Sequence, residues 1–139
     1  MRRTPSGALA VSFRLDADFA RVRIPPLRRA RFVDGLWRQT CFEVFVARKG
    51  SRAYREYNLS PSLEWAAYEF SAYRKRSGRK IGRPRWNGRV ATIAARGCLQ
   101  IGLSAVIEET SGALSYWALR HPPGKPDFHD RRGFALELA

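Results

Sequence analysis

The feature that most constrains this chain is a series of short runs in which apolar and polar residues alternate. A period of two is typical of strands that bury one face, and turn-forming residues separate the runs. Segments with helical periodicity are nearly absent. The pattern therefore predicts an all-β chain that folds as an antiparallel β-sandwich. Strands are expected at 8–15, 21–25, 41–47, 54–59, 99–108, 114–119 and 133–138.

The segment 62–73 has two interpretations. Its composition suits a helix, and Ser62 could cap the N-terminus of that helix. As a strand, the segment alternates between a face with Tyr68 and Phe70 and a face with Trp65. We favour the strand.

Two of the expected strands carry polar side chains where an apolar face would be ordinary. In 54–59, Glu56 and Asn58 share one face, and in 41–47, Glu43 lies on the face opposite the main apolar set. If the two strands align, these groups form a polar floor suited to hydroxyl groups. Register decides this, and the sequence alone does not fix register.

Length and composition favour one domain over residues 1–139. The 139 residues, 45% of them hydrophobic, suffice for one core and are too few for two. No stretch reaches the length of a membrane span. The N-terminal apolar run is interrupted by Ser12 and ends at Arg14, so it is too short for the apolar region of a signal peptide. We therefore expect a cytoplasmic location.

The two cysteines, Cys41 and Cys98, lie far apart in strand-like contexts. Two buried free thiols are favoured over a disulfide, as in a reducing compartment. Neither residue belongs to a CxxC pair, and two cysteines alone do not make a metal site.

The charge balance is strongly basic, with 26 Lys and Arg against 12 Asp and Glu and a formal net charge of +14. The densest run, 73–89, holds eight positive charges and no acid, and its three glycines and one proline favour a mobile loop. Such a run attracts polyanions, so an electrostatic binder of nucleic acid is an alternative function. Its candidate residues are Arg74, Lys75, Arg76, Arg79, Lys80, Arg83 and Arg85, with Trp86 stacking on bases.

Three motifs carry a family resemblance: GLWRQTCFEVFVA (35–47), YREYNLSPSLEWAAYEF (54–70) and GLSAVIEETSGALSYWALRHPPGKPDFHDRRGFALEL (102–138). They resemble the DOMON-like domains related to family-9 carbohydrate-binding modules, which occur in bacteria and are sometimes fused to a reductase of peptidoglycan precursor synthesis. The resemblance implies a jelly-roll-like β-sandwich. Such domains as a group bind either sugars or haem.

The sequence departs from that family in two places. Family members carry a strand before the segment that starts here, which leaves open whether the sandwich lacks an N-terminal strand. The stretch 71–99 is also short. A missing outer strand would leave an unpaired sheet edge, through which the chain could form a homodimer or dock onto a partner. A structural or interaction domain with no small-molecule ligand is therefore a further alternative function.

The resemblance and the residue types together suggest a carbohydrate site. In family-9 modules a tryptophan and a glutamate at a similar separation help build the sugar site, which singles out Trp37 and Glu43. Sugar rings stack on aromatic planes, and their hydroxyl rims need fixed donors and acceptors. The candidate ligand-binding residues are Trp37, Glu43, Arg55, Asn58, Trp117 and His121, with Glu56 beside them.

The remaining motifs argue against catalysis and against a metal or cofactor. His121, Asp127 and His129 are metal-ligand types, but their spacing matches no standard site. Met1 is the only methionine, so a His/Met haem site is excluded, and a haem site built on His121 and His129 is not favoured. No nucleophile–base motif is present. We therefore expect a non-catalytic module without a cofactor.

Overall fold

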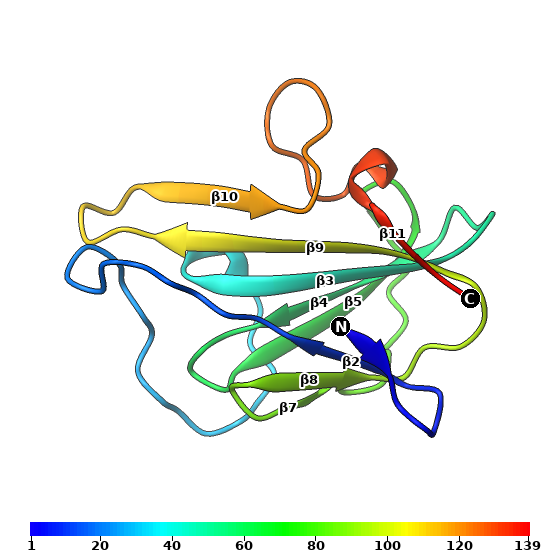
Figure 1. Ribbon diagram of the computed structural model, residues 1–139, viewed down its shortest axis with the longest axis horizontal. Coiled ribbons are helices and arrows are strands. Elements are labelled where there is room, and N and C mark those ends of the chain that lie inside the picture. The colour runs from blue at the N-terminus through cyan, green and yellow to red at the C-terminus, as the bar shows by residue number, and fades with distance from the viewer.

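The computed structural model describes residues 1–139 and consists of two antiparallel sheets that face each other (Figure 1). This confirms the predicted all-β sandwich. The helical segments are two short 3-10 turns, Leu36–Arg38 and Arg131–Gly133, and no helix has the length and hydrophobicity needed to cross a membrane.

The larger sheet has the strand order β10-β9-β3-β4-β5-β6, and β11 also pairs with β9 beyond the end of β10. The smaller sheet has the order β1-β2-β8-β7. The bounds of the larger sheet are β3 Cys41–Arg48, β4 Tyr54–Leu59, β5 Trp65–Ala72, β6 Lys75–Arg76, β9 Leu99–Glu108, β10 Leu114–Ala118 and β11 Leu136–Leu138. Those of the smaller sheet are β1 Arg2–Arg3, β2 Leu9–Ser12, β7 Arg85–Trp86 and β8 Val90–Ile93.

Most of the alternating runs form strands, including the ambiguous segment 62–73, which contains β5. The expected strand at 21–25 is wrong: only an isolated bridge between Val22 and Glu109 forms there. Arg23 nevertheless donates its backbone N–H to Glu108 O at 2.8 Å, so the segment is tied to the end of β9. The run 73–89 is not one open loop, because it contains β6 and β7.

The larger sheet is buried on both faces. One face packs against the smaller sheet, with Leu9 and Val11 of β2 meeting Val44 of β3 and Ile101 of β9. The other face carries a second apolar cluster, which includes Phe45. Leu36, Cys41, Phe45, Ala47, Tyr54, Ala66, Tyr68, Phe70 and Phe134 form this second cluster. The outer face is therefore covered by segments around 36 and 134, so a polar group on it is removed from water.

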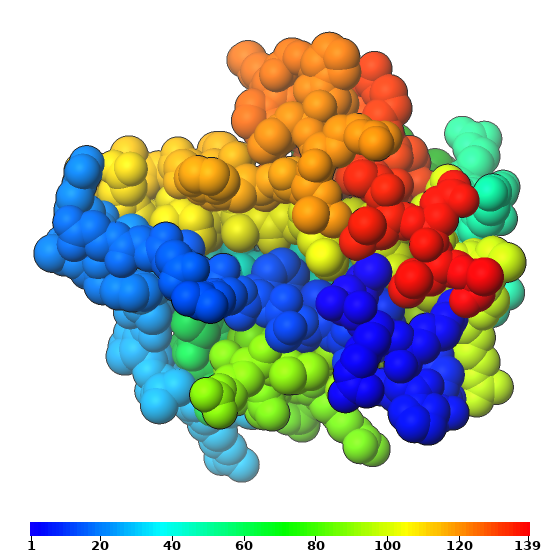
Figure 2. Space-filling model, viewed as in Figure 1, coloured from blue at the N-terminus to red at the C-terminus, as the bar shows by residue number.

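The two ends of the chain meet on one side of the molecule, where blue N-terminal and red C-terminal residues lie against each other in Figure 2. Arg3 Nε donates to the backbone oxygen of Ala139 at 3.0 Å. Both cysteines are free. Cys41 is buried as expected, but Cys98 is exposed, because it lies in the turn before β9 and outside the alternating part of that strand.

Candidate functional site

A cavity of about 560 Å³ lies over the outer face of the larger sheet. Its floor comes from β3, β4 and β9, and its walls come from the segment after residue 35, the β5–β6 turn, β10 and the loop before residue 130. Its size is typical of small-molecule sites. It is lined by Trp37, Arg38, Glu43, Glu56, Phe70, Arg74, Arg76, Val106, Leu114, Tyr116, Pro126, Phe128 and His129.

Strand register brings the polar side chains of the floor together. Glu43 of β3 pairs with Asn58 of β4 on one side and with Ser104 of β9 on the other. Glu56 pairs with Phe45, which is two positions from Glu43 on the same face. Side chains on one face of neighbouring strands contact one another directly or diagonally. The three polar groups expected to share a face therefore form one cluster.

Burial changes the acidity of both carboxyl groups. Glu43 and Glu56 are only 3% and 5% exposed. Burial raises the pKa of Glu43 to about 8, with a further contribution from the charge of Glu56, while a hydrogen bond from Ser104 Oγ at 3.3 Å opposes the rise. Burial likewise raises the pKa of Glu56 to about 7. Near neutral pH such carboxyl groups both donate and accept hydrogen bonds.

Asn58 is fully buried, and neither Oδ1 nor Nδ2 of its side chain makes a hydrogen bond of normal geometry. The amide is still close enough to Glu56 to oppose the rise in the pKa of that carboxyl. Leaving a buried amide unpaired costs roughly 1–3 kcal/mol. An unpaired amide beside two buried acids is the kind of feature that functional sites retain at the expense of stability.

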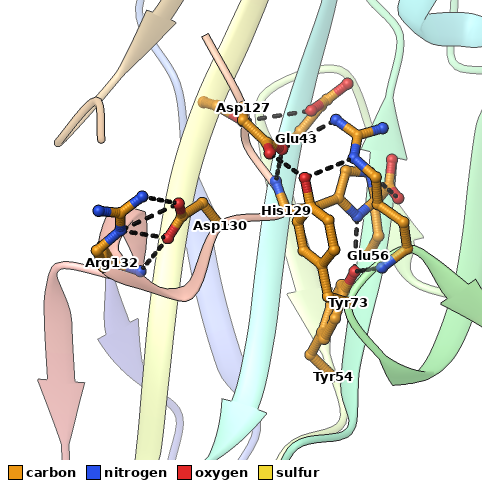
Figure 3. Close-up of polar contacts among 10 residues, drawn as sticks. Glu43, Tyr54, Glu56, Tyr73, Asp127, His129, Asp130 and Arg132 are labelled. Carbon is orange, nitrogen blue, oxygen red and sulfur yellow. Dashed lines mark hydrogen bonds and ion pairs between the residues drawn. The ribbon is translucent and has the colours of Figure 1, made fainter. Parts of the chain in front are cut away.

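His129 reaches the floor from the C-terminal segment (Figure 3). Its Nδ1 lies 2.8 Å from the hydroxyl of Tyr54, and that hydroxyl also accepts a bond from the backbone N–H of Arg74 at 3.0 Å. The Tyr54 hydroxyl can donate its proton to Nδ1, and in that arrangement the imidazole proton lies on Nε2. Nε2 lies 3.6 Å from Glu56 Oε2.

The His129 imidazole is held neutral. Burial is the main cause that lowers its pKa to about 4, and the positive charge of Arg74 adds to the effect. Its contact with Glu56 is therefore not an ion pair at neutral pH, and 3.6 Å is longer than a hydrogen bond. The floor thus presents an imidazole N–H and two weakly acidic carboxyl groups, with little net charge.

Asp127 fixes the segment that carries His129. Its carboxylate accepts bonds from Arg74 Nη2 at 2.9 Å, from the backbone N–H of His129 at 3.1 Å and from the Tyr73 hydroxyl. These donors hold the pKa of Asp127 below its usual value, against the opposing effect of burial. The C-terminal segment is thereby tied to the turn between β5 and β6.

Aromatic and basic side chains surround the opening. Trp37 lies beside Tyr68, with ring centroids 6.2 Å apart, and the guanidinium groups of Arg38 and Arg76 lie 5.9 and 6.0 Å from the Trp37 ring. Tyr116 and Phe128 line the wall on the side of β10 and the C-terminal loop. The site therefore combines a polar floor, an aromatic wall and a cationic rim.

Of the residues expected to bind a carbohydrate, Trp37 and Glu43 line this cavity, and Asn58 lies directly beside Glu43. Arg55 does not join them, because it points to the opposite face of β4. There it lies 3.4 Å from Glu69 and lines a separate cavity between the sheets.

Trp117 and His121 are also absent from the site. Trp117 pairs with Ala105, so it shares the face of Phe42 and is 63% exposed, whereas its neighbour Tyr116 pairs with Val106 and faces the cavity. His121 is exposed and lies beside Phe128, with ring centroids 6.2 Å apart.

The basic run divides between two surroundings. Arg74 and Arg76 line the cavity, while Lys75, Arg79, Lys80, Arg83 and Arg85 are exposed outside it. Trp86 is not placed to stack on bases: its Nε1 donates to Ser60 O at 2.7 Å, and its ring packs against the core between the sheets.

Sequence reasoning missed the contributions of His129, Tyr54 and Arg38 to this cavity, and it assigned Arg74 and Arg76 to polyanion binding instead. His129 was considered only as a ligand of a metal ion or of haem, and no cluster of three or more His, Cys, Asp or Glu side chains is arranged to hold a metal ion. The alternation in 54–59 already placed Tyr54 on the face of Glu56.

Comparison of the chain with protein-family models, with curated proteins and with solved structures gives no match.

Proposed function

We propose that this protein is a non-catalytic binding module, and that its ligand is a carbohydrate or a sugar-bearing cell-wall precursor held in the cavity over the larger sheet. The observation that carries the proposal is the joint position of Trp37, Glu43 and Glu56 in one hollow. The resemblance of the chain to DOMON-like domains agrees with it.

The chemistry of the cavity suits a polyol. The indole of Trp37 offers a plane for the C–H face of a sugar ring. Glu43 and Glu56, with raised pKa values, offer donors as well as acceptors to hydroxyl groups. Asn58 lies beside Glu43 with its amide buried and unpaired, and a ligand would reach this amide only if the Glu43 side chain moved.

The arrangement of the two carboxyl groups favours binding over hydrolysis. Glycoside hydrolases use carboxyl groups that flank the scissile bond. Here Glu43 and Glu56 project from neighbouring strands of one floor, so they would contact the same side of a bound ring.

Calorimetry with glucose, N-acetylglucosamine and nucleotide sugars tests the proposal. We expect binding heat that Trp37→Ala abolishes and that Trp117→Ala leaves intact, because Trp117 lies on the other face of the sheet. A flat trace across the panel, or equal loss in both variants, would contradict it.

A second candidate is electrostatic binding of nucleic acid, supported by the exposed positions of Lys75, Arg79, Lys80, Arg83 and Arg85. Such binding would weaken steeply with added salt in a gel-shift assay. Neutralising these five residues would abolish it, and Trp37→Ala would not affect it.

A further inference from the structure

A neutral sugar does not require the positive charge that the arginines bring to the cavity. The charged residues that line the cavity are three arginines and two glutamates: Arg38, Arg74, Arg76, Glu43 and Glu56. The raised pKa values of the two acids reduce their negative charge near neutral pH, so they do not balance the arginines. The cavity is therefore positive overall, although its floor suits hydroxyl groups.

Arg76 is the arginine most available to a ligand. Its guanidinium makes no hydrogen bond within the protein, and its single ion pair, to Asp34, spans 3.9 Å. It lies 4.0 Å from the ring centroid of Tyr68, so stacking fixes its plane while its N–H groups stay free. Arg74, in contrast, is bonded to Asp127 and Tyr73.

Arg38 offers a second free guanidinium, which lies near the Trp37 ring, as that of Arg76 does. It makes no side-chain hydrogen bond, and it and Arg76 both lie within about 6 Å of the centroid of Trp37. A ring bound beside Trp37 would thus turn one edge to the acids of the floor and bring another edge within reach of the two arginines.

We propose that the ligand is a saccharide that carries an anionic group, phosphate or carboxylate, next to the sugar ring, and that Arg76 and Arg38 bind this group. Guanidinium groups pair with phosphate and carboxylate through two parallel hydrogen bonds. This inference rests on the proposed function, and it narrows the ligand to acidic or phosphorylated sugars.

Calorimetry on the full chain tests the inference with paired probes: glucose against glucose 1-phosphate and glucuronic acid, and N-acetylglucosamine against its 1-phosphate. We expect the anionic member of a pair to bind at least about tenfold more tightly, since hydrogen bonds between ionised groups are roughly twice as strong as those between neutral groups. The phosphate and glucuronate arms distinguish the two anions.

The variants Arg76→Gln and Lys75→Gln make a matched comparison, because they remove the same charge one residue apart and Lys75 lies outside the cavity. We expect Arg76→Gln to reduce the preference to within about threefold while the neutral sugar still binds. Lys75→Gln should leave the preference unchanged.

Four results would overturn the inference. Equal binding of neutral and anionic sugars would remove it and leave the carbohydrate function standing, whereas absence of binding by every sugar would remove both. Equal losses in Arg76→Gln and Lys75→Gln would show general attraction by net charge. Inorganic phosphate that binds as tightly as the sugar phosphates, with no effect of Trp37→Ala, would show a simple anion site.

Discussion

The hydroxyl of Tyr54 and Nδ1 of His129 lie 2.8 Å apart and join β4 to a segment 75 residues later in the chain. The same hydroxyl accepts the backbone N–H of Arg74 at 3.0 Å. One side chain therefore connects the floor of the cavity, the β5–β6 turn and the C-terminal segment. Two of the aromatic neighbours of Tyr54 support this position: Phe70 stacks on it at 4.8 Å, and Phe134 meets it edge-on at 5.8 Å.

Tyr54→Phe should destabilise the protein although it keeps the ring. The change removes the partner of His129 and leaves the Arg74 N–H unbonded, so we expect the free energy of unfolding to fall by about 1–3 kcal/mol. Urea unfolding measures this. Tyr116→Phe is the control, because the Tyr116 hydroxyl makes no hydrogen bond and the ring is exposed, so its effect should stay within about 0.5 kcal/mol. Equal effects of the two changes would contradict the role given to Tyr54.

The buried acids should make stability fall as pH rises. Because the folded protein holds the pKa of Glu43 near 8 and that of Glu56 near 7, it binds more protons than the unfolded chain above about pH 4.5. His129 acts in the opposite direction between about pH 4 and 6.5, since its pKa is lowered on folding. The range from pH 6.5 to 8 therefore isolates the glutamates.

In that range we expect the melting temperature to decrease with pH, and Glu43→Gln to remove much of the decrease. One pKa unit corresponds to about 1.4 kcal/mol, so the variant should be more stable than the wild type at pH 8 by at least about 1 kcal/mol. Glu137→Gln serves as the control, since Glu137 is exposed and ionised throughout this range. A flat profile for the wild type would contradict the burial of the acids.

Alternation predicted most of the strands because each one buries a face against a neighbouring layer. It failed at 21–25, where the arginines and Val22 alternate but only one bridge forms. Alternation also predicts which face of the strand Arg55 lies on, and the choice of Arg55 as a ligand-binding residue, made on residue type, overlooked this. Arg55 and Asn58 are three positions apart in one strand, so they point to opposite faces and were never able to share a site.

The rest of the site depends on long-range geometry that the sequence does not fix. Whether Tyr116 or Trp117 faces the cavity depends on the register of β10 against β9, and one residue of shift would exchange them. His129 rather than His121 lines the cavity because of the path of the C-terminal loop, which is held by the hydrogen bonds to Asp127. Local patterns carry no signal for either outcome.

Trp86→Ala should cost stability and have little effect on polyanion binding. The indole packs on the core between the sheets and donates to Ser60 O at 2.7 Å, so its loss leaves a void and removes one of the two hydrogen bonds to that carbonyl. We expect a loss of about 1–3 kcal/mol in the free energy of unfolding, because the indole is only partly buried. Arg85→Ala, at the neighbouring exposed position, is the matched control and should change stability little. If Trp86→Ala weakened nucleic-acid binding in a protein of unchanged stability, the stacking role would be restored.

Asn58→Leu should separate the stability of the site from its function. Leucine has the branched shape of asparagine without its polar atoms, and both polar atoms of Asn58 are buried without hydrogen bonds of normal geometry. We therefore expect the free energy of unfolding to stay constant or rise by about 1 kcal/mol, since replacing an unpaired buried amide removes its desolvation cost. Asn58→Ala is the control for packing and should lower stability through the void that it leaves.

Calorimetry with the sugar panel should show weaker binding for Asn58→Leu, because the ligand loses the amide. A marked loss of stability in Asn58→Leu would instead show that the amide is bonded in the folded protein, with the carboxyl of Glu56 as the nearest partner.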